Sequence, residues 1–196
     1  MPSLPAPVRL AIFARYPRPG EAKTRLIPAL GADGAALVYR RLLERTVTAA
    51  RQSGLRFELR VTGAAPARFH EWLGDDLVIV PQGLGDLGER LMRAAAPGIV
   101  IGSDAPALTP QLLQAAALAL ETAPAVIGPA HDGGYYLLGF NTPVPFAFAD
   151  IEWSTSGVFQ ETLRRLEANG MAPHILPPLS DIDTMDDLAN WPELLP

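Results

Sequence analysis

Short apolar segments alternate with helix-like segments along most of this chain, and this alternation limits its possible folds more than any other feature. Prolines and glycines bound most of the apolar segments, as expected for buried strands. The intervening segments carry apolar residues at helical spacing or are rich in alanine and leucine. Such an alternation over about 140 residues predicts an α/β three-layer sandwich with a mostly parallel central sheet. We expect strands at 8–14, 55–61, 77–80, 99–101, 125–127, 135–140 and 174–176, and helices at 33–51, 66–73, 86–95, 110–121 and 158–169.

The length of the chain, 196 residues, fits one domain with its own core. We find no internal repeat and no linker-like segment, so we expect residues 1–196 to form a single domain. Asp33 is the expected N-cap of the first helix. In a sheet of this type the ligand site lies beyond the carboxyl ends of the strands, which directs attention to the loops that follow them.

Composition excludes several classes of protein. The chain has no cysteine, which removes disulfides, thiol nucleophiles and cysteine-ligated metals. Its net charge of −5 argues against a general nucleic-acid binder. No apolar run approaches the length of a membrane span, and the first residues do not have the pattern of a secretory signal. We therefore expect a cytoplasmic enzyme or binding protein, with its oligomeric state open.

The loop at residues 15–25 follows the first expected strand and is strongly basic. It carries Arg15, Lys23 and Arg25, and Gly20 and neighbouring prolines stiffen it. Lys23 is the sole lysine among 16 basic residues. A point charge beside forked arginine donors suits the phosphates of a nucleotide, although a solvated basic loop is the simpler interpretation. The loop is not a P-loop, because its glycine spacing differs.

A literal G-x-G-x-x-G stands at Gly83, Gly85 and Gly88, between an expected strand and an expected helix. This pattern is also found in dinucleotide-binding folds, which is the main rival interpretation. We disfavour it because Pro81 and Gln82 separate the strand from the first glycine. The loop can still hold the base or ribose of a nucleotide, and we include Asp86 and Gly88 among the nucleotide-binding candidates.

Three aspartates are candidates for a Mg²⁺ or Mn²⁺ site. Asp104 ends a central strand, and Asp181 and Asp183 lie two residues apart in an acidic C-terminal segment. Mg²⁺ prefers oxygen ligands and takes one or two carboxylates together with substrate phosphates. The simpler interpretations are a turn cap at Asp104, a helix cap at Asp183 or Thr184, and a solvated acidic tail.

Two further loops are candidates for binding a small-molecule acceptor. The first is a tight glycine turn, and the second precedes the last long helix, where a hydroxyl can simply act as N-cap. The candidate residues are Asp132, Gly133, Gly134 and Tyr135 in the turn, and Trp153, Ser154 and Thr155 in the second loop.

Taken together, the motifs resemble a known group. ARYPRPGEAKTRL, GDLGER, IGSDAPALTP, DGGYYLLGF, WSTSGV and DIDTMDDL occur in the order seen in the DUF2064 family of the nucleotide-diphospho-sugar transferase (GT-A) superfamily. The first and last motifs are also similar to those of phospholactate guanylyltransferase. The resemblance implies a Rossmann-like GT-A fold, a nucleotide donor and a divalent cation. It also implies that the 15–25 loop holds donor phosphates and Asp104 binds metal. An Asp-x-Asp motif, frequent in glycosyltransferases of this fold, is absent at Asp104.

These observations predict a Mg²⁺-dependent transferase that uses a nucleotide. We favour nucleotidyl transfer from a nucleoside triphosphate to a small acceptor that bears a phosphate or carboxylate. Lys23, Arg25 and Asp104 are the expected catalytic residues, because such catalysis is mostly positioning and charge neutralisation. The alternatives are a glycosyltransferase that uses a nucleotide-sugar and a nucleotide-binding regulator without catalytic activity.

Overall fold

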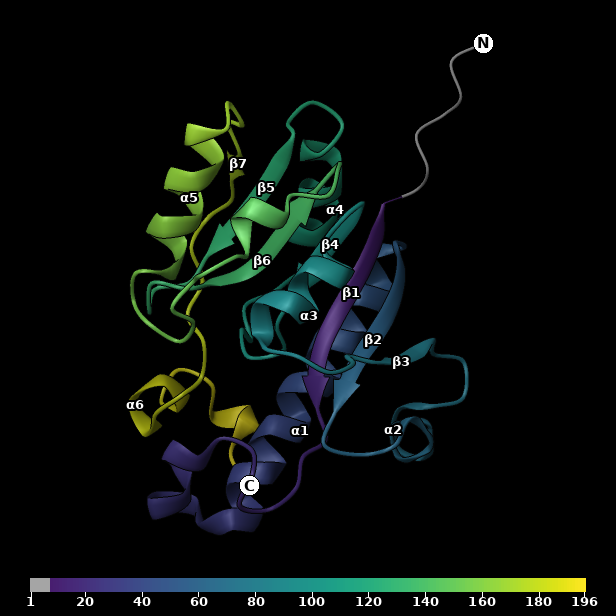
Figure 1. The fold of residues 1–196 in the computed structure, drawn as a ribbon. Helices are drawn as coiled ribbons and strands as arrows, with labels where there is room; N and C mark the ends of the chain where they lie inside the picture. The colour runs from purple at the N-terminus through teal and green to yellow at the C-terminus, as the bar shows by residue number, and fades with distance from the viewer. Residues whose placement is uncertain (1–7) are drawn as a thin grey trace.

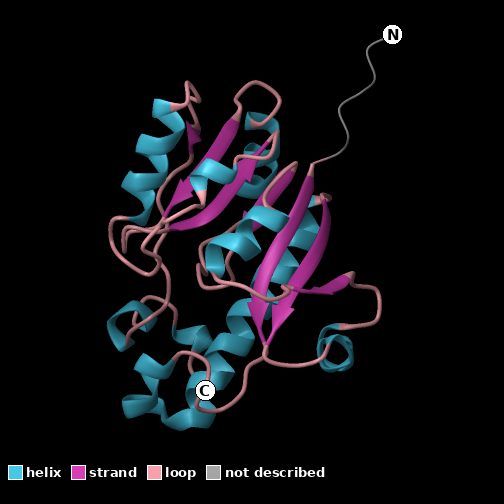
Figure 2. Ribbon diagram, viewed as in Figure 1, coloured by secondary structure: helices cyan, strands magenta, loops and turns pink. Residues whose placement is uncertain are grey.

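The computed structural model describes residues 8–196, and these residues build one seven-stranded mixed sheet with helices on both faces (Figures 1 and 2). The first seven residues, where the sequence was searched for a secretory signal, lie outside the described residues. The strands are β1 (Arg9–Arg15), β2 (Arg56–Thr62), β3 (Ile79–Pro81), β4 (Gly98–Ile101), β5 (Ala125–Pro129), β6 (Tyr135–Phe140) and β7 (His174–Ile175). The α-helices are α1 (Ile27–Ser53), α2 (Pro66–Leu73), α3 (Leu87–Ala94), α4 (Pro110–Ala119), α5 (Val158–Ala168) and α6 (Met185–Leu188).

The strand order is β3-β2-β1-β4-β6-β5-β7, and β6 alone among these strands runs against its neighbours. The pairs β1–β2, β1–β4, β2–β3 and β5–β7 are parallel. β1 therefore lies inside the sheet, with β2 on one side and β4 on the other. The carboxyl ends of β1 and β4 meet at one edge of the sheet, where we expected the site.

The two faces of the sheet bury different residues, because successive side chains of a strand point to opposite sides. On β1, Leu10 and Ile12 pack with residues of α1, α2 and α4, whereas Ala11 packs with residues of α3 and α5. α1, α2 and α4 thus cover one face and α3 and α5 cover the other. This arrangement confirms the predicted α/β sandwich with its mostly parallel sheet.

Most expected elements have the predicted type, with bounds that shift by a few residues. The expected start of the first helix at Asp33 is wrong. The helical segment begins at Ile27, with Pro28 in its first turn, and Gly31 interrupts it with φ 71° and ψ 170°. Leu26 before the helix and Leu188 of α6 share a separate small core, which joins the start of α1 to the C-terminal segment.

We predict that Gly139→Ala destabilises the sheet by about 1–3 kcal/mol, the usual cost of overpacking a core. A methyl group at Gly139 of β6 would lie 2.9 Å from side-chain atoms of both Ile99 and Val126. At Gly102 the same methyl group meets no atom within 4 Å, so Gly102→Ala is the matched control. Urea unfolding of both variants checks this, and equal midpoints would contradict the packing.

Candidate active site

Two connected cavities lie at the carboxyl ends of the strands. The smaller, of about 350 Å³, is lined by residues of the 15–25 loop together with Tyr39, Asp104 and Asp183. The larger, of about 690 Å³, shares Arg15, Arg25 and these three residues and continues across β1, β4 and β6. The basic loop and the acidic segments, which lie far apart in the sequence, thus border one continuous hollow.

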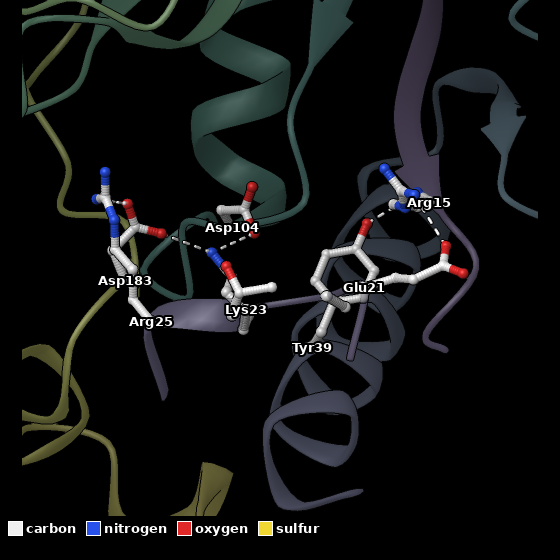
Figure 3. A pocket seen from close by; sticks show the side chains of 9 residues that line it. Arg15, Glu21, Lys23, Arg25, Tyr39, Asp104 and Asp183 are labelled. Carbon is white, nitrogen blue, oxygen red and sulfur yellow. Dashed lines mark hydrogen bonds and ion pairs between the residues drawn. The ribbon is translucent and has the colours of Figure 1, made fainter. Parts of the chain in front are cut away.

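Lys23 connects the two aspartates that the sequence singled out as metal ligands (Figure 3). Its Nζ lies 2.6 Å from Oδ1 of Asp104 and 3.1 Å from Oδ1 of Asp183. The Lys23 side chain is 8% exposed, whereas those of Asp104 and Asp183 are 40% and 42% exposed. Burial opposes the charge of Lys23, but the two carboxylates outweigh it and raise the pKa of the ammonium.

Two of the three arginines of the loop, Arg15 and Arg25, line the smaller cavity. Arg25 donates from Nη1 to Oδ2 of Asp183 at 2.9 Å, so that carboxylate receives both Lys23 and Arg25. Arg15 donates from Nη2 to Oε2 of Glu21 at 2.8 Å. Both arginine side chains are more than half exposed, which leaves donors available to a ligand.

Tyr39 of α1 fixes the strand ends under the site. Its buried hydroxyl accepts a hydrogen bond from the backbone N–H of Arg15 and pairs with Oγ of Ser103, each at 2.9 Å. Burial raises the pKa of the Tyr39 hydroxyl, so it stays neutral. Sequence reasoning missed Tyr39, because a tyrosine on the apolar face of a helix has the same pattern as a core residue.

The C-terminal acidic segment is tied to the site by backbone contacts. Ile182 N donates to the carbonyl of Asp104 at 3.0 Å, which places Asp181 and Asp183 beside the end of β4. Thr184, and not Asp183, caps α6 in a reciprocal pair with Asp187. The helix-cap interpretation of Asp183 is therefore wrong, and its carboxylate faces the basic loop.

Asp181 is the most perturbed carboxyl of the site. Burial, and then the charge of Asp104, raises its pKa to about 7, against the opposing effect of Lys23. Its Oδ1 is buried and has no hydrogen-bond partner among the described residues. A buried carboxylate oxygen without a partner is costly, so this group favours a proton or a cation.

The acceptor-loop candidates border the larger cavity. Asp132 accepts from Gly134 N at 2.9 Å and closes the turn before β6. A methyl group at Gly133 would lie 2.0 Å from the carbonyl oxygen of Ser156, so only glycine lets the turn and the second loop pack together. The candidates that line this cavity are Asp132, Gly134, Tyr135, Trp153, Ser154, Thr155 and Asp181.

The glycine-rich segment follows β3, an edge strand of the sheet, and not the central β1. Asp86 accepts from Glu89 N at 2.9 Å and caps α3, and Gly88 packs closely against Phe148 and Trp153. Within residues 8–196, neither cavity is lined by four of the candidates from the sequence: Asp86, Gly88, Gly20 and Gly133. Gln82 and Leu87 of the same segment do line the larger cavity.

Comparison with known proteins identifies the family of the chain. Residues 43–155 match the profile of a family described as an uncharacterized protein conserved in bacteria, DUF2064. The chain belongs to this family. No curated protein sequence matches it significantly. Within residues 8–196, no helix is both long and apolar enough to cross a membrane.

Solved structures extend the comparison. A crystal structure described as a "putative nucleotide-diphospho-sugar transferase" from Desulfovibrio desulfuricans is 32% identical, with a TM-score of 0.86 over 95% of this chain and 87% of that one. Rv0371c from Mycobacterium tuberculosis, solved in complex with manganese, is 18% identical, with a TM-score of 0.59 over 98% and 99%. A 2-C-methyl-D-erythritol 4-phosphate cytidylyltransferase from Thermus thermophilus is 20% identical, with a TM-score of 0.53 over 96% and 98%. The last two show the fold alone.

We predict that Asp181→Asn makes the protein less sensitive to pH. The ordinary aspartate pKa is about 4, so between roughly pH 4 and 7 the folded protein retains a proton that the unfolded chain has lost. Stability from this group is complete below that window and is lost as the pH rises to about 7. The Tm of the variant minus that of the wild type should grow through this window and then level off. Calorimetry in EDTA measures it, and a constant difference would contradict the burial of Asp181.

Proposed function

We propose that the protein is a divalent-metal-dependent transferase that moves a nucleotidyl group from a nucleoside triphosphate to a small acceptor. The observation that carries this proposal is the contact of Lys23 and Arg25 with the carboxylates of Asp104 and Asp183, in a cavity that Arg15 also lines. It lies at the carboxyl ends of β1 and β4, where open α/β sheets bind nucleotides. The fold that the chain shares with the cytidylyltransferase supports the same conclusion.

The three cations are suited to triphosphate binding. Arg15 and Arg25 each offer a planar guanidinium with several N–H donors at the exposed edge of the smaller cavity. The buried Lys23 supplies a compact positive charge to the same cavity. In the described structure they pair with acidic side chains, at N–O distances of 2.6–3.1 Å. Incoming phosphate oxygens compete for the same donors. Preorganised positive charge of this kind stabilises the charge that develops during transfer.

The acidic residues fit a divalent cation, although no group of three or more His, Cys, Asp or Glu side chains within residues 8–196 forms a ready-made metal cage. Asp104 and Asp183 would hold the ion, and the partnerless Oδ1 of Asp181 is a further oxygen beside them. Two carboxylates suffice for Mg²⁺, because it takes other ligands from water and substrate phosphates. When bound, such an ion supplies charge neutralisation at the phosphates.

The larger cavity has room for the nucleoside and the acceptor. We assign the nucleoside to the side of Gln82 and Leu87, and the acceptor to the side of Asp132 and Trp153. An acceptor oxygen attacks the α-phosphorus, the new P–O bond forms, and the bond between the α-phosphorus and the bridging oxygen breaks. Pyrophosphate leaves with that electron pair. The phosphate- or carboxylate-bearing acceptor that we expected from the sequence stays a prediction.

Glycosyl transfer is the second candidate, because the 32% identical structure is described as a "putative nucleotide-diphospho-sugar transferase". In that reaction the acceptor attacks the anomeric carbon, and a nucleoside diphosphate leaves. The sequence Asp104-Ala105-Pro106 lacks the Asp-x-Asp metal motif frequent in such enzymes. A nucleotide-binding regulator would bind the same ligands without turnover.

A ligand screen tests the proposal. Melting temperatures are measured with each nucleoside triphosphate and each nucleotide-sugar, with and without Mg²⁺. A ligand at a hundred times its Kd adds about 2.7 kcal/mol to stability. Stabilisation by a triphosphate that requires Mg²⁺ supports nucleotidyl transfer, whereas a preference for nucleotide-sugars supports glycosyl transfer. If neither the triphosphates nor the nucleotide-sugars stabilise the protein, the proposal is refuted.

We predict that Arg15→Ala weakens triphosphate binding roughly 10- to 100-fold, the cost of one charge-assisted hydrogen bond. Arg164→Ala is the matched control. Arg164 also pairs with a glutamate at 2.8 Å and is similarly exposed, but it lies on α5 outside both cavities. Calorimetry measures both affinities, and equal losses would remove Arg15 from the site.

We predict that Asp104→Asn lowers Mg²⁺-dependent turnover at least about 100-fold, since charge neutralisation at phosphates contributes several kcal/mol. The substitution keeps the size of the side chain, and Lys23 retains Asp183 as its partner. Transfer of an α-labelled nucleotide is the readout. Asp76→Asn, at an ion pair with Arg51 remote from the cavities, should keep full turnover. Unchanged activity of Asp104→Asn would end its assignment as a metal ligand.

A further inference from the structure

Lys23 occupies the position between the two carboxylates that a divalent cation needs. Its ammonium lies 2.6 Å from Asp104 and 3.1 Å from Asp183, and its side chain is the most buried of the three. Figure 3 shows the ammonium pointing between the two acids from the basic loop. Asp104 follows β4, and Asp183 comes from the C-terminal segment, which the hydrogen bond from Ile182 N to the Asp104 carbonyl holds beside β4. The charge of Lys23 is what makes their approach favourable.

We propose that Lys23 is an internal counter-ion that occupies the metal carboxylates in the nucleotide-free protein and moves to the substrate phosphates when metal and nucleotide bind together. This inference rests on the proposed function, and it adds an order of events to it. The free metal ion must compete with a cation already in place. The nucleotide removes this competitor, because its phosphates offer the ammonium an alternative partner, and it also supplies oxygens that complete the metal shell.

The chemistry of lysine suits such an exchange. Its ammonium is a point charge on a flexible four-carbon stem, whereas an arginine would hold a carboxylate through a planar, two-bond fork. All the remaining Lys or Arg positions in the chain are arginine, so the lysine at position 23 is the exception. The phosphate-binding role alone does not require it, because arginine binds phosphates at least as well.

The backbone around Lys23 is fixed, so only its side chain needs to move. Lys23 has φ 47° and ψ 48°, a left-handed conformation that a side-chain-bearing residue rarely adopts. Its carbonyl accepts a hydrogen bond from Leu26 N at 2.9 Å, and Leu26 is fully buried. The ammonium therefore moves by rotation of the Lys23 side chain, while the backbone of Lys23 stays in place in the lining of the smaller cavity.

A permanent structural ion pair is the competing explanation, and the two differ in metal affinity. If Lys23 competes with the metal, removing its charge strengthens metal binding in the absence of nucleotide. If Lys23 only holds the aspartates in position, removing it disorders the carboxylates and weakens metal binding. The direction of the change thus separates the two explanations.

Mn²⁺ binding to the nucleotide-free protein, followed by electron paramagnetic resonance, tests the proposal. Lys23→Met keeps an unbranched side chain one atom shorter than lysine and removes its charge. We expect it to bind Mn²⁺ roughly tenfold or more tightly than the wild type, in line with the loss of a neighbouring positive charge. The double variant Lys23→Met with Asp104→Asn should lose this gain. An affinity of Lys23→Met equal to or below that of the wild type, or a gain that survives Asp104→Asn, would overturn the proposal.

A second measurement uses the wild-type chain and does not depend on the fold of a variant. Because Lys23 is the sole lysine, protein labelled with ¹³C-lysine gives one Cε signal. Because free metal competes with the ammonium for the same carboxylates, a high concentration of Mg²⁺ should displace Lys23 even without nucleotide and move this signal to a saturating value, with a NaCl titration of equal ionic strength as control. An unmoved signal at high Mg²⁺ contradicts the exchange. Calorimetry with nucleoside triphosphates is run in parallel: loss of nucleotide binding with metal competition intact refutes the proposed function and not the counter-ion.

Discussion

The ion pairs of Lys23 join three parts of the chain that lie far apart in the sequence. Lys23 belongs to the loop after β1, Asp104 to the end of β4, and Asp183 to the segment after β7. Without a cation among them, the two carboxylates would repel each other at the edge of the sheet. Beneath them, the hydroxyl of Tyr39 bonds to the backbone of Arg15 and to Ser103, and so links the end of β1 to the segment after β4. The charged side chains therefore lie above a neutral group that is hydrogen-bonded on both sides.

Much of the fold follows from patterns that the sequence shows directly. Strands such as β6 and helices such as α2 are short, well bounded by turn residues, and uniform in their periodicity. The start of α1 is different, because Pro28 can begin a helix while Gly31 can break one, and the outcome depends on packing against the C-terminal segment. Local signals cannot decide such a case, since the deciding contact comes from residues that are distant in the chain.

Most of the residues that border the two cavities could be picked out from the sequence, but their pairing could not. A strand end marks Arg15 and Asp104 as candidates, and the acidic tail marks Asp183. The sequence does not indicate that Lys23 would contact both aspartates, because this depends on the 181–184 segment crossing the end of β4 through the contact of Ile182 with Asp104. Tyr39 was missed for a related reason: its hydroxyl partners are Arg15 at the end of β1 and Ser103 in the loop after β4, which only the folded sheet brings together.

β6 runs antiparallel to its two neighbours, and its direction separates the proposed acceptor side of the site from the proposed nucleotide side. β5 and β6 form a hairpin, so the turn that holds Asp132 is joined to the sheet without a helical crossover. On our assignment, this turn and the loop at 153–156 face the acceptor, while the loop after β1 and the end of β4 face the nucleotide. This turn lies apart from the ends of β1 and β4, where Arg15 and Asp104 stand, although Gly133 within it must stay glycine to pack against Ser156. The fold can therefore change its acceptor while its nucleotide chemistry stays constant.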